Sequence, residues 1–504
     1  MREHVKKNLW RVLLAVGTAA AVLVLAIWAV SLIRQERQAI QNDGGKQLAA
    51  AAQQMDAIAI EAALDPDGKA MQVSQQLTLT LRTQEPRQEL ALRTWPNAFL
   101  KPGTSPIAGN ADCCPDGFSA GSLVMAQVQV ELNGQTTDAL YRYTDEDKTL
   151  LSIPLAESWQ PGETLQVNLR YTVNFPHAMY RFGWWGDTFM AGHAFAVPAL
   201  WQNGAYRADS WLPIGDPLSG ECANYTLRLT APKGYVCAAG GSITGVARTG
   251  DSVTYTIEAQ AVRDLGLVIS RDLKKVTRQN GGILLEALAA DQATARRMLD
   301  TAQASLAAYT ERFGMYPWPV YSVCSLPLGV SGAEYTALSM VADDLKGEQL
   351  EHTVAHETAH QWWYGLVGSD CTTHPWMDEA LCEYSLLCYV QDRYGDRARE
   401  ELRQTLIEPA MRITVAGQAT PGAPLDYFET ATDYSVLVYG RATALFCAVD
   451  DLLGGRLNDA LKHYAGLHAF GIADRPDLPK AVWEATGEDI EPLMVDYLDT
   501  YLLH

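Results

Sequence analysis

The first half of the chain contains several runs in which apolar and polar residues alternate with a period of two. Four runs show it clearly: residues 72–81, 123–132, 164–171 and 225–230. The second run ends at Asn133 and Gly134, a pair typical of a tight hairpin turn. We interpret the aromatic cluster at 180–185 as packing, because no candidate catalytic residue stands beside it in the sequence. Since alternating side chains lie on opposite faces of a strand, the pattern predicts a β-rich domain over residues 67–272.

The second half of the chain changes to helical spacing. Apolar residues recur every three or four positions over residues 291–313, and Gly314, followed by two prolines, ends this run. A strand-like run follows at 320–326, and from there to the C-terminus the pattern is mostly helical. Runs of strands followed by runs of helices are typical of an α+β protein, so we predict a mostly helical domain over residues 273–504.

The N-terminus has a long apolar segment with basic flanks. Residues 12–33 contain no charge, and a stretch of this length can cross a bilayer as a helix. Four Lys and Arg residues lie within 1–11, so the positive-inside rule places that tail in the cytoplasm. We predict a transmembrane signal anchor, a juxtamembrane linker over 34–66, and an extracytoplasmic catalytic domain at the cell membrane. A cleaved signal peptide is the alternative.

Composition excludes some classes of function. The chain has 504 residues, 48% of them hydrophobic, which is enough for more than one domain with its own core. The formal net charge of −20 argues against an extended basic face, so no nucleic-acid partner is expected. The nine cysteines show no CxxC pair and no zinc-ribbon spacing. Nothing in the composition predicts the oligomeric state.

The motif H-E-x-x-H occupies residues 356–360. His356 and His360 are four positions apart on one helix face, so both imidazoles can bind a single metal ion. The apolar and aromatic flanks argue against the alternative, two histidines on a solvated helix surface. A hydrolytic zinc site needs a third protein ligand and an open position for water, and Glu379 follows on a second predicted helix. We therefore predict one zinc ion per chain, bound by these three residues.

Glu357 is the candidate general base. As the neighbour of His356 it points to a different side of the helix, so it can reach the open position without occupying a ligand site. It can accept a proton from a zinc-activated water and later return it to the leaving amine. Asp378 and Glu383 are near enough in sequence to orient a ligand histidine, with placement on the surface as the alternative.

These segments together resemble the aminopeptidase N family of gluzincins. In that family, H-E-x-x-H is followed after eighteen residues by a glutamate, here Glu379, and residues 311–319 resemble its entry into the catalytic domain. Over roughly residues 70–504 the resemblance implies a saddle-like antiparallel β domain and a thermolysin-like catalytic domain. The expected fold class is α+β, with an N-terminal transmembrane helix ahead of both domains.

The resemblance also implies substrate-binding residues. Residues 331–335 stand where the family has its GAMEN exopeptidase motif. By this correspondence Glu334 would bind the free α-amino group of the substrate, and Gly332 and Ala333 would offer backbone groups to an extended peptide. Tyr335 replaces the family's Asn, which changes the chemistry of this pocket.

A tyrosine is expected to stabilise the oxyanion. Residues 436–442 look like the family's Tyr-x-Lys-Gly segment, with Arg441 in place of Lys, and Tyr439 is the matching tyrosine. A neutral phenol can donate a hydrogen bond to the oxygen on which charge develops. Tyr434, five residues earlier, is the fallback for this role.

The expected activity is peptide-bond hydrolysis by a membrane-anchored zinc metallopeptidase with peptides as substrates. An aminopeptidase that releases N-terminal residues is the first hypothesis. Larger family members continue with further domains, so the cleft is expected to be less enclosed here and an endopeptidase is the alternative. A catalytically inactive cell-surface binding protein and a zinc hydrolase of non-peptide substrates are the remaining hypotheses.

Overall fold

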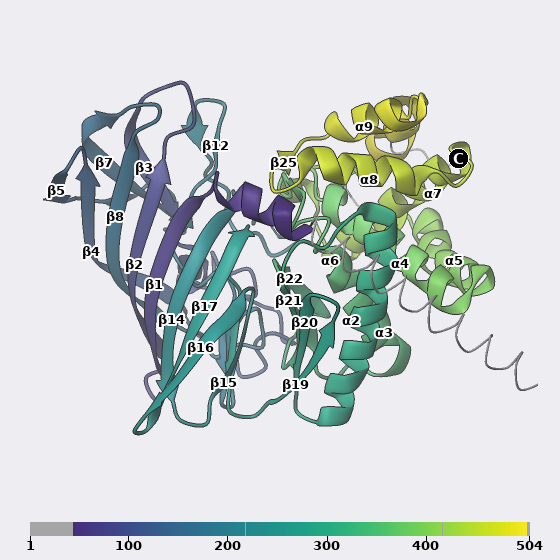
Figure 1. Cartoon of the computed structure of the whole chain (residues 1–504). Coiled ribbons are helices and arrows are strands. Elements are labelled where there is room, and N and C mark those ends of the chain that lie inside the picture. The colour runs from purple at the N-terminus through teal and green to yellow at the C-terminus, as the bar shows by residue number, and fades with distance from the viewer. Residues whose placement is uncertain (1–43, 217, 416, 501–504) are drawn as a thin grey trace, which may run out of the picture.

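The structure is a computed structural model that describes residues 44–216, 218–415 and 417–500. A sheet-rich N-terminal half lies beside a mostly helical C-terminal half (Figure 1). The predicted order of a β domain before a helical domain is therefore confirmed. The predicted tail at 1–11 and the predicted transmembrane segment at 12–33 lie outside the described residues. Within the described residues, no helix has both the length and the apolar character that a membrane span requires.

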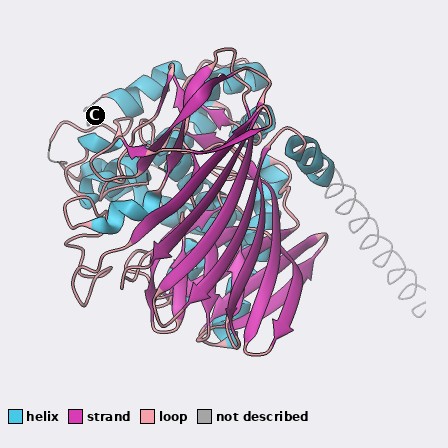
Figure 2. Cartoon of the chain, turned by 90° about the vertical axis from the view of Figure 1, so that its left-hand side faces the viewer, coloured by secondary structure: helices cyan, strands magenta, loops and turns pink. Residues whose placement is uncertain are grey.

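The N-terminal half is built on an eight-stranded sheet, whose strands face the viewer in Figure 2 with helices behind them. In spatial order the strands are β16 (Ser242–Thr249), β17 (Ser252–Val262), β14 (Ala223–Pro232), β1 (Asp56–Asp65), β2 (Ala70–Thr80), β8 (Thr164–Asn174), β4 (Ser122–Leu132) and β5 (Gln135–Asp138). Neighbours are antiparallel except β1 and β14, which are parallel. Buried and more exposed residues alternate along β2 and β8, so the predicted period-two strands are confirmed.

Strand β1 begins inside the stretch that we predicted to be a linker. Residues 44–52 are helical, as their composition favours, but β1 pairs with two neighbours in the middle of the sheet. Ile58, Ile60 and Leu64 are buried, while the alanines between them give little contrast between the two faces. The prediction of a linker as far as residue 66 is corrected, because sheet pairing overrides the weak local preference.

Smaller sheets complete the N-terminal half. One four-stranded sheet contains β15 (Val236–Ala239), β18 (Leu267–Ser270), β10 (Thr188–Ala191) and β9 (Phe182–Trp185). Another contains β11 (Val197–Pro198), β3 (Arg87–Arg93), β7 (Leu150–Trp159) and β6 (Arg142–Tyr143). This half also contains a separate two-stranded hairpin of β12 (Trp201–Gln202) and β13 (Ala205–Tyr206), and the 3₁₀ turn η1 (Trp95–Leu100).

The C-terminal half begins with a five-stranded sheet and a long helix. The sheet order is β19 (Lys274–Asn280), β20 (Ile283–Ala289), β21 (Val320–Leu326), β23 (Leu338–Ala342) and β22 (Gly332–Tyr335). Helix α2 (Gln292–Phe313) starts where the Asp291 carboxylate accepts the backbone N–H groups of Ala293 and Thr294. It ends at Gly314, whose φ of 98° few other residues adopt. The helix and strand predicted for this region are confirmed.

The remaining elements are mainly helical. They are α3 (Gly347–Ala359), α4 (Trp376–Tyr394), α5 (Asp396–Arg412), η2 (Leu425–Tyr427), α6 (Ala431–Tyr434), the π-helix η3 (Ser435–Arg441), α7 (Ala442–Leu452), α8 (Leu457–His468), α9 (Asp477–Thr486), α10 (Glu491–Met494), the π-helix η4 (Val495–Asp499) and the short pair β24 (Gly368–Ser369) and β25 (Ile472–Ala473). Trp363, just after α3, donates its indole N–H to the hydroxyl of Ser385 on α4 at 2.9 Å. This bond connects the two helices that carry the predicted metal ligands.

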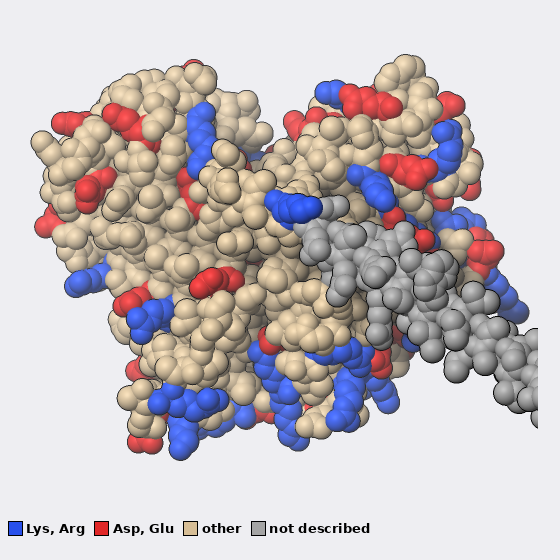
Figure 3. All heavy atoms as spheres, viewed as in Figure 1, with Lys and Arg blue, Asp and Glu red and all other residues tan. Residues whose placement is uncertain are grey.

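Charged side chains of both signs occupy the face shown in Figure 3. Lys and Arg gather along its lower edge, near β16 and β19, while Asp and Glu are scattered over the rest of the face. The nine cysteines all lie within the described residues, and none of them is paired in a disulfide there.

Candidate active site

Helix α3 is fixed against the sheet and against α2 by buried hydrogen bonds. The hydroxyl of Tyr309 on α2 donates to the carbonyl of Ala355 at 3.0 Å. The hydroxyl of Ser339 on β23 donates to the carbonyl of Glu357 at 3.1 Å. The helix ends at Ala359, and His360 is its C-cap residue. These contacts hold the H-E-x-x-H motif in one position relative to the sheet.

The structure brings the three predicted metal ligands together. The Nε2 atoms of His356 and His360 are 3.2 Å apart, and Oε2 of Glu379 on α4 lies 3.3 Å from the first and 3.5 Å from the second. Tetrahedral ligands at about 2.0–2.1 Å from a zinc ion are separated by roughly 3.3–3.4 Å. The three residues therefore have the spacing that a zinc ion requires.

The other ring nitrogens set the tautomers of both histidines. Nδ1 of His360 lies 3.1 Å from the carbonyl oxygen of Trp363, which can only accept, so Nδ1 must carry the proton. Nδ1 of His356 lies 3.1 Å from Oε1 of Glu383, which favours the same tautomer. Both Nε2 atoms are thus left with free lone pairs that face each other, an arrangement that a cation satisfies. The residues fit a zinc ion.

Glu383 and Asp378 were both predicted as residues that could orient a ligand. Glu383 has this position, because it contacts His356. Asp378 is buried, but its Oδ2 accepts from the thiol of Cys371 at 3.1 Å, and Trp363 supplies the contact to His360 instead. The two residues therefore differ in what they touch, although neither is on the surface.

Opposing effects determine the ionisation of the ligands. Burial disfavours the charged imidazole of His356, but the carboxylates of Glu383 and Glu379 outweigh it and raise its pKa to about 10. Burial also acts against the ionised form of Glu379, but hydrogen bonds from His356 and His360 lower its pKa overall. A divalent cation bound by these three residues would favour the ionised carboxylate and the neutral imidazoles. It would therefore replace the protons that the two histidines otherwise hold beside Glu379.

Glu357 is buried beside the ligands. Burial raises the pKa of its carboxyl group to about 7. A methyl group at Gly332 on β22 would lie only 2.0 Å from its Oε1. The strand thus passes directly over the carboxylate, and Gly332 leaves the space that Glu357 occupies. Ala333, the next residue, is 1% exposed, so a contact from it to a substrate would involve its backbone.

A cavity of about 480 Å³ opens at this cluster between the two halves of the molecule. The N-terminal half contributes residues such as Ile107, Arg181 and Asp216 to its lining. The C-terminal half contributes Gly332, His356, Glu357, Glu379, Tyr434 and Tyr439. Two of the three ligands, the candidate base and both candidate tyrosines therefore face one space, and His360 lies directly behind them.

Tyr439 and Tyr434 lie beside each other in this cavity. The ring of Tyr439, on η3, stacks 5.9 Å from the ring of His356, and the two tyrosine rings are 5.7 Å apart. Burial and the neighbouring carboxylate of Glu379 raise the pKa of both phenols well above the usual value. Both are therefore neutral donors, and Tyr439 is the one that packs on a ligand.

Glu334 has partners that the sequence did not indicate. Its Oε2 lies 3.3 Å from Nη2 of Arg181, and the same Nη2 lies 2.6 Å from Oδ2 of Asp216. Both partners belong to the N-terminal half, and Arg181 lies within the aromatic cluster that we interpreted as packing. No pattern in the sequence links them to Glu334, since their separation along the chain exceeds any local period.

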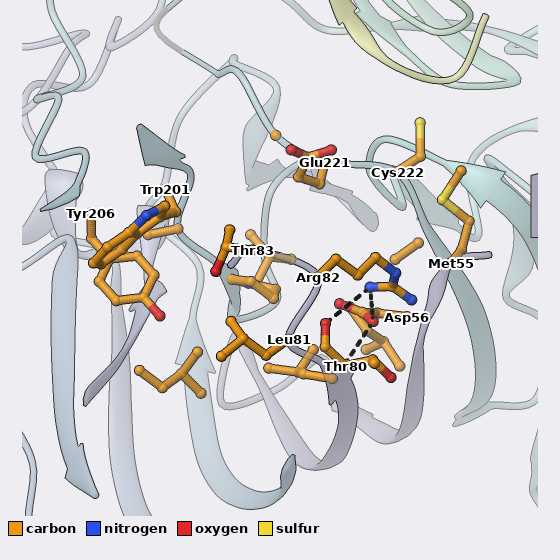
Figure 4. A pocket seen from close by; sticks show the side chains of 18 of the residues that line it. Met55, Asp56, Thr80, Leu81, Arg82, Thr83, Trp201, Tyr206, Glu221 and Cys222 are labelled. Carbon is orange, nitrogen blue, oxygen red and sulfur yellow. Dashed lines mark hydrogen bonds and ion pairs between the residues drawn. The ribbon is translucent and has the colours of Figure 1, made fainter. Parts of the chain in front are cut away.

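A second cavity, of about 270 Å³, lies in the N-terminal half (Figure 4). Trp201 and Tyr206 stand on one side of it, and the ion pair of Arg82 with Asp56 stands on the other. The described part of the chain has two groups of potential metal ligands, His356 with His360 and Glu379, and Glu334 with Glu357 and His360. Neither group lies in this second cavity. The chemistry predicted from the sequence is therefore confined to the first cavity.

Comparison with known proteins agrees with this geometry. Residues 297–497 match the peptidase family M1 domain. Aminopeptidase N of Lactobacillus helveticus is 26% identical over 245 residues, which are 44% of this chain and 29% of that protein. Aminopeptidase M1-B of Oryza sativa subsp. japonica is 24% identical over 215 residues, which are 40% of this chain and 25% of that protein. The matches thus span less than a third of these relatives' lengths.

Similarity of structure extends over most of the chain. The M1 zinc metallopeptidase of Deinococcus radiodurans has the same fold with a TM-score of 0.61 and 19% identity, covering 89% of this chain and 94% of that one. The fold and the ligand set are those of a gluzincin. The resemblance to the aminopeptidase N-like gluzincins inferred from the motifs is confirmed, and residues 297–497 match the peptidase family M1 domain.

Proposed function

We propose that this protein is a zinc-dependent metallopeptidase that removes residues from the N-termini of peptides. The observation that supports it best is the triangle of donor atoms, 3.2–3.5 Å apart, next to the buried Glu357, with His356, Glu357 and Glu379 lining one cavity. The similar proteins from Lactobacillus helveticus and Oryza sativa are aminopeptidases by name. Zinc bound by His356, His360 and Glu379 supplies a Lewis acid that lowers the pKa of water toward neutrality.

The residues of the chain divide the remaining work. Glu357 accepts the proton of the attacking water and returns it to the leaving amine, a role that suits a buried carboxylate that lines the same cavity as His356 and Glu379. Tyr439 donates a hydrogen bond to the carbonyl oxygen as it becomes negative. Gly332 and Ala333 offer the backbone of β22 to an extended peptide, as a strand edge does in other peptide complexes.

Tyr439→Phe tests the oxyanion role. The change removes the donor but keeps the ring that packs on His356, so zinc content should stay the same. The kcat should fall roughly 100-fold to 1,000-fold, the usual effect of losing one oxyanion donor. Tyr434→Phe is the matched variant, because Tyr434 lines the same cavity. If kcat drops only in the Tyr434 variant, that residue holds the role instead.

The position of cleavage is tested with one peptide in free and N-acetylated form. Because the proposal requires recognition of an α-ammonium, the free form should yield a stepwise ladder of products and the acetylated form should be nearly inert. Mass spectrometry of the digest, with and without a chelator, measures this. Equal internal cuts in both forms would show an endopeptidase and leave the zinc-peptidase proposal in place.

We also propose that residues 12–33 anchor the protein in the cell membrane, with the N-terminus in the cytoplasm and the catalytic domain outside. The support is the uncharged length of this segment and its basic N-terminal flank. The full-length protein should stay in the membrane pellet after alkaline extraction and be accessible to protease added outside the cell. Release of the full-length protein by alkaline extraction would contradict the anchor.

A further inference from the structure

The loop that follows helix α3 contains a tyrosine in a strained backbone conformation. Tyr364 is buried, and its φ is 143°, a positive value that glycine adopts readily and that other residues rarely adopt. Strain of this kind persists only where the surrounding structure enforces it, and it is often found at functional sites. Tyr364 therefore needs partners that hold it in this conformation.

The strained torsion lies next to a peptide group that contacts a proposed metal ligand. The carbonyl of Trp363 accepts the hydrogen bond from Nδ1 of His360, at 3.1 Å. Because a peptide group is planar, the φ of Tyr364 sets the direction of this carbonyl relative to the rest of Tyr364. The orientation of the His360 ring thus depends on how Tyr364 is held.

Two adjacent, buried residues of the N-terminal half hold Tyr364 at both of its ends. Nε of Arg263 donates to the backbone carbonyl of Tyr364 at 2.7 Å. The carboxylate of Asp264 accepts a hydrogen bond from the phenol of the same tyrosine. Both residues directly follow β17, so the partners of Tyr364 come from the other half of the molecule.

The guanidinium of Arg263 is itself fixed against both halves. Its Nη1 donates to the carbonyl of Gly220 at 2.6 Å, and its Nη2 donates to the carbonyl of Gly471 at 2.8 Å. A methyl group at Gly368 on β24 would lie only 2.3 Å from its Cζ. The guanidinium therefore has little room to move, and the carbonyl of Tyr364 is held in a fixed place.

The carboxylate of Asp264 has a second anchor in the turn between β22 and β23. Its Oδ1 accepts the backbone N–H of Thr336 at 3.0 Å. The backbone N–H of Arg263 donates to the hydroxyl of Thr336 at 3.1 Å. The same two residues thus connect the loop after α3 to the strand that passes over Glu357.

We propose that Arg263 and Asp264 are positioning residues for the zinc site, because they hold Tyr364 at its strained torsion and so direct the Trp363 carbonyl toward His360. The inference rests on the proposed function, since it requires His360 to bind zinc. It gives the N-terminal half a role in metal affinity. Partners of the second nitrogen of a ligand histidine orient the ring, and their loss typically lowers metal affinity about 10-fold to 100-fold.

The zinc affinity of the full-length protein, measured by competition with a chelator, tests this assignment. Arg263→Gln should raise the Kd for zinc about 10-fold to 100-fold. Tyr364→Phe keeps the ring and removes only the hydrogen bond to Asp264, so it should raise the Kd at least about threefold. Arg207→Gln is the matched control and should leave the Kd unchanged. Arg207 also connects the two halves, but its partner in the C-terminal half is Asp370, at 2.7 Å.

The visible absorption spectrum of the cobalt(II)-substituted protein separates positioning from general stabilisation, because it depends on the geometry of the metal ligands. The spectrum should shift in Arg263→Gln and in Tyr364→Phe. It should stay the same in Tyr255→Phe, which removes another buried tyrosine hydrogen bond, from Tyr255 to the carbonyl of Tyr235 at 2.8 Å. If Arg263→Gln does not fold, Tyr364→Phe decides the result.

Zinc binding is measured without a peptide substrate, so the two proposals can fail separately. Tight zinc binding that weakens in Tyr364→Phe, in a protein that cleaves no peptide, would overturn the proposed function alone. A role in stability only would lower the unfolding temperature of the metal-free variants and leave their zinc Kd and cobalt spectrum equal to those of the wild type. That result, with normal peptide cleavage by the wild type, would overturn the inference alone.

Discussion

Alanine in place of His356 or of Glu379 is expected to abolish tight zinc binding and all measurable peptidase activity. Each residue supplies one corner of a triangle of donor atoms with sides of 3.2–3.5 Å, and a tetrahedral ion cannot keep its position with only two protein ligands. The zinc content of the purified full-length protein, measured by elemental analysis after dialysis, tests this directly. The wild type should hold one zinc ion per chain.

The same helix offers a matched control for this experiment. His352 lies one turn before His356 on α3 and also lines the cavity, but its partner is Glu348, at 3.7 Å. His352→Ala should therefore keep its zinc. This result would show that removing a histidine near the site does not by itself abolish zinc binding. A full zinc complement in the His356 or Glu379 variant would refute the ligand assignment.

Glu357→Gln should keep the zinc and lower kcat by at least about 100-fold. Glutamine has the same shape, so the ligand triangle remains, but it cannot accept the proton of the attacking water. Zinc content and kcat must be measured on the same preparation, because only their combination separates loss of the base from loss of the metal. Near-normal turnover in this variant would assign the base to another residue.

Gly332→Ala tests the same carboxylate from the opposite side. The added methyl group would lie 2.0 Å from Oε1 of Glu357, so the carboxylate or the strand must move. Turnover should fall while zinc stays bound. Gly466→Ala is the control, because a methyl group at Gly466 on α8 meets no atom within 4 Å. Equal activity of the two variants would show that the position of Glu357 is not critical.

The amino-acid sequence by itself determined the features that depend on local rules. The period-two runs identified β2, β4, β8 and β14, and the capped apolar run identified α2, since each pattern follows from the geometry of one element. The pair His356 and His360 was predictable for the same reason, because residues four apart share a helix face. To predict Glu379 as the third ligand, local spacing was not sufficient. That prediction also used the family resemblance and the expectation that a second helix packs against the first.

Only the tertiary structure decided which distant side chains meet. Arg181 and Glu334 are 153 positions apart, and a contact between residues so far apart produces no periodic pattern in the amino-acid sequence. The same holds for β1, whose weak local pattern becomes a strand in the middle of the sheet through its two neighbours. Glu383 was distinguished from Asp378 only by the way α4 packs on α3. Helix and strand periods act over a few residues, whereas packing between the two halves placed Arg181 and Asp216 beside Glu334.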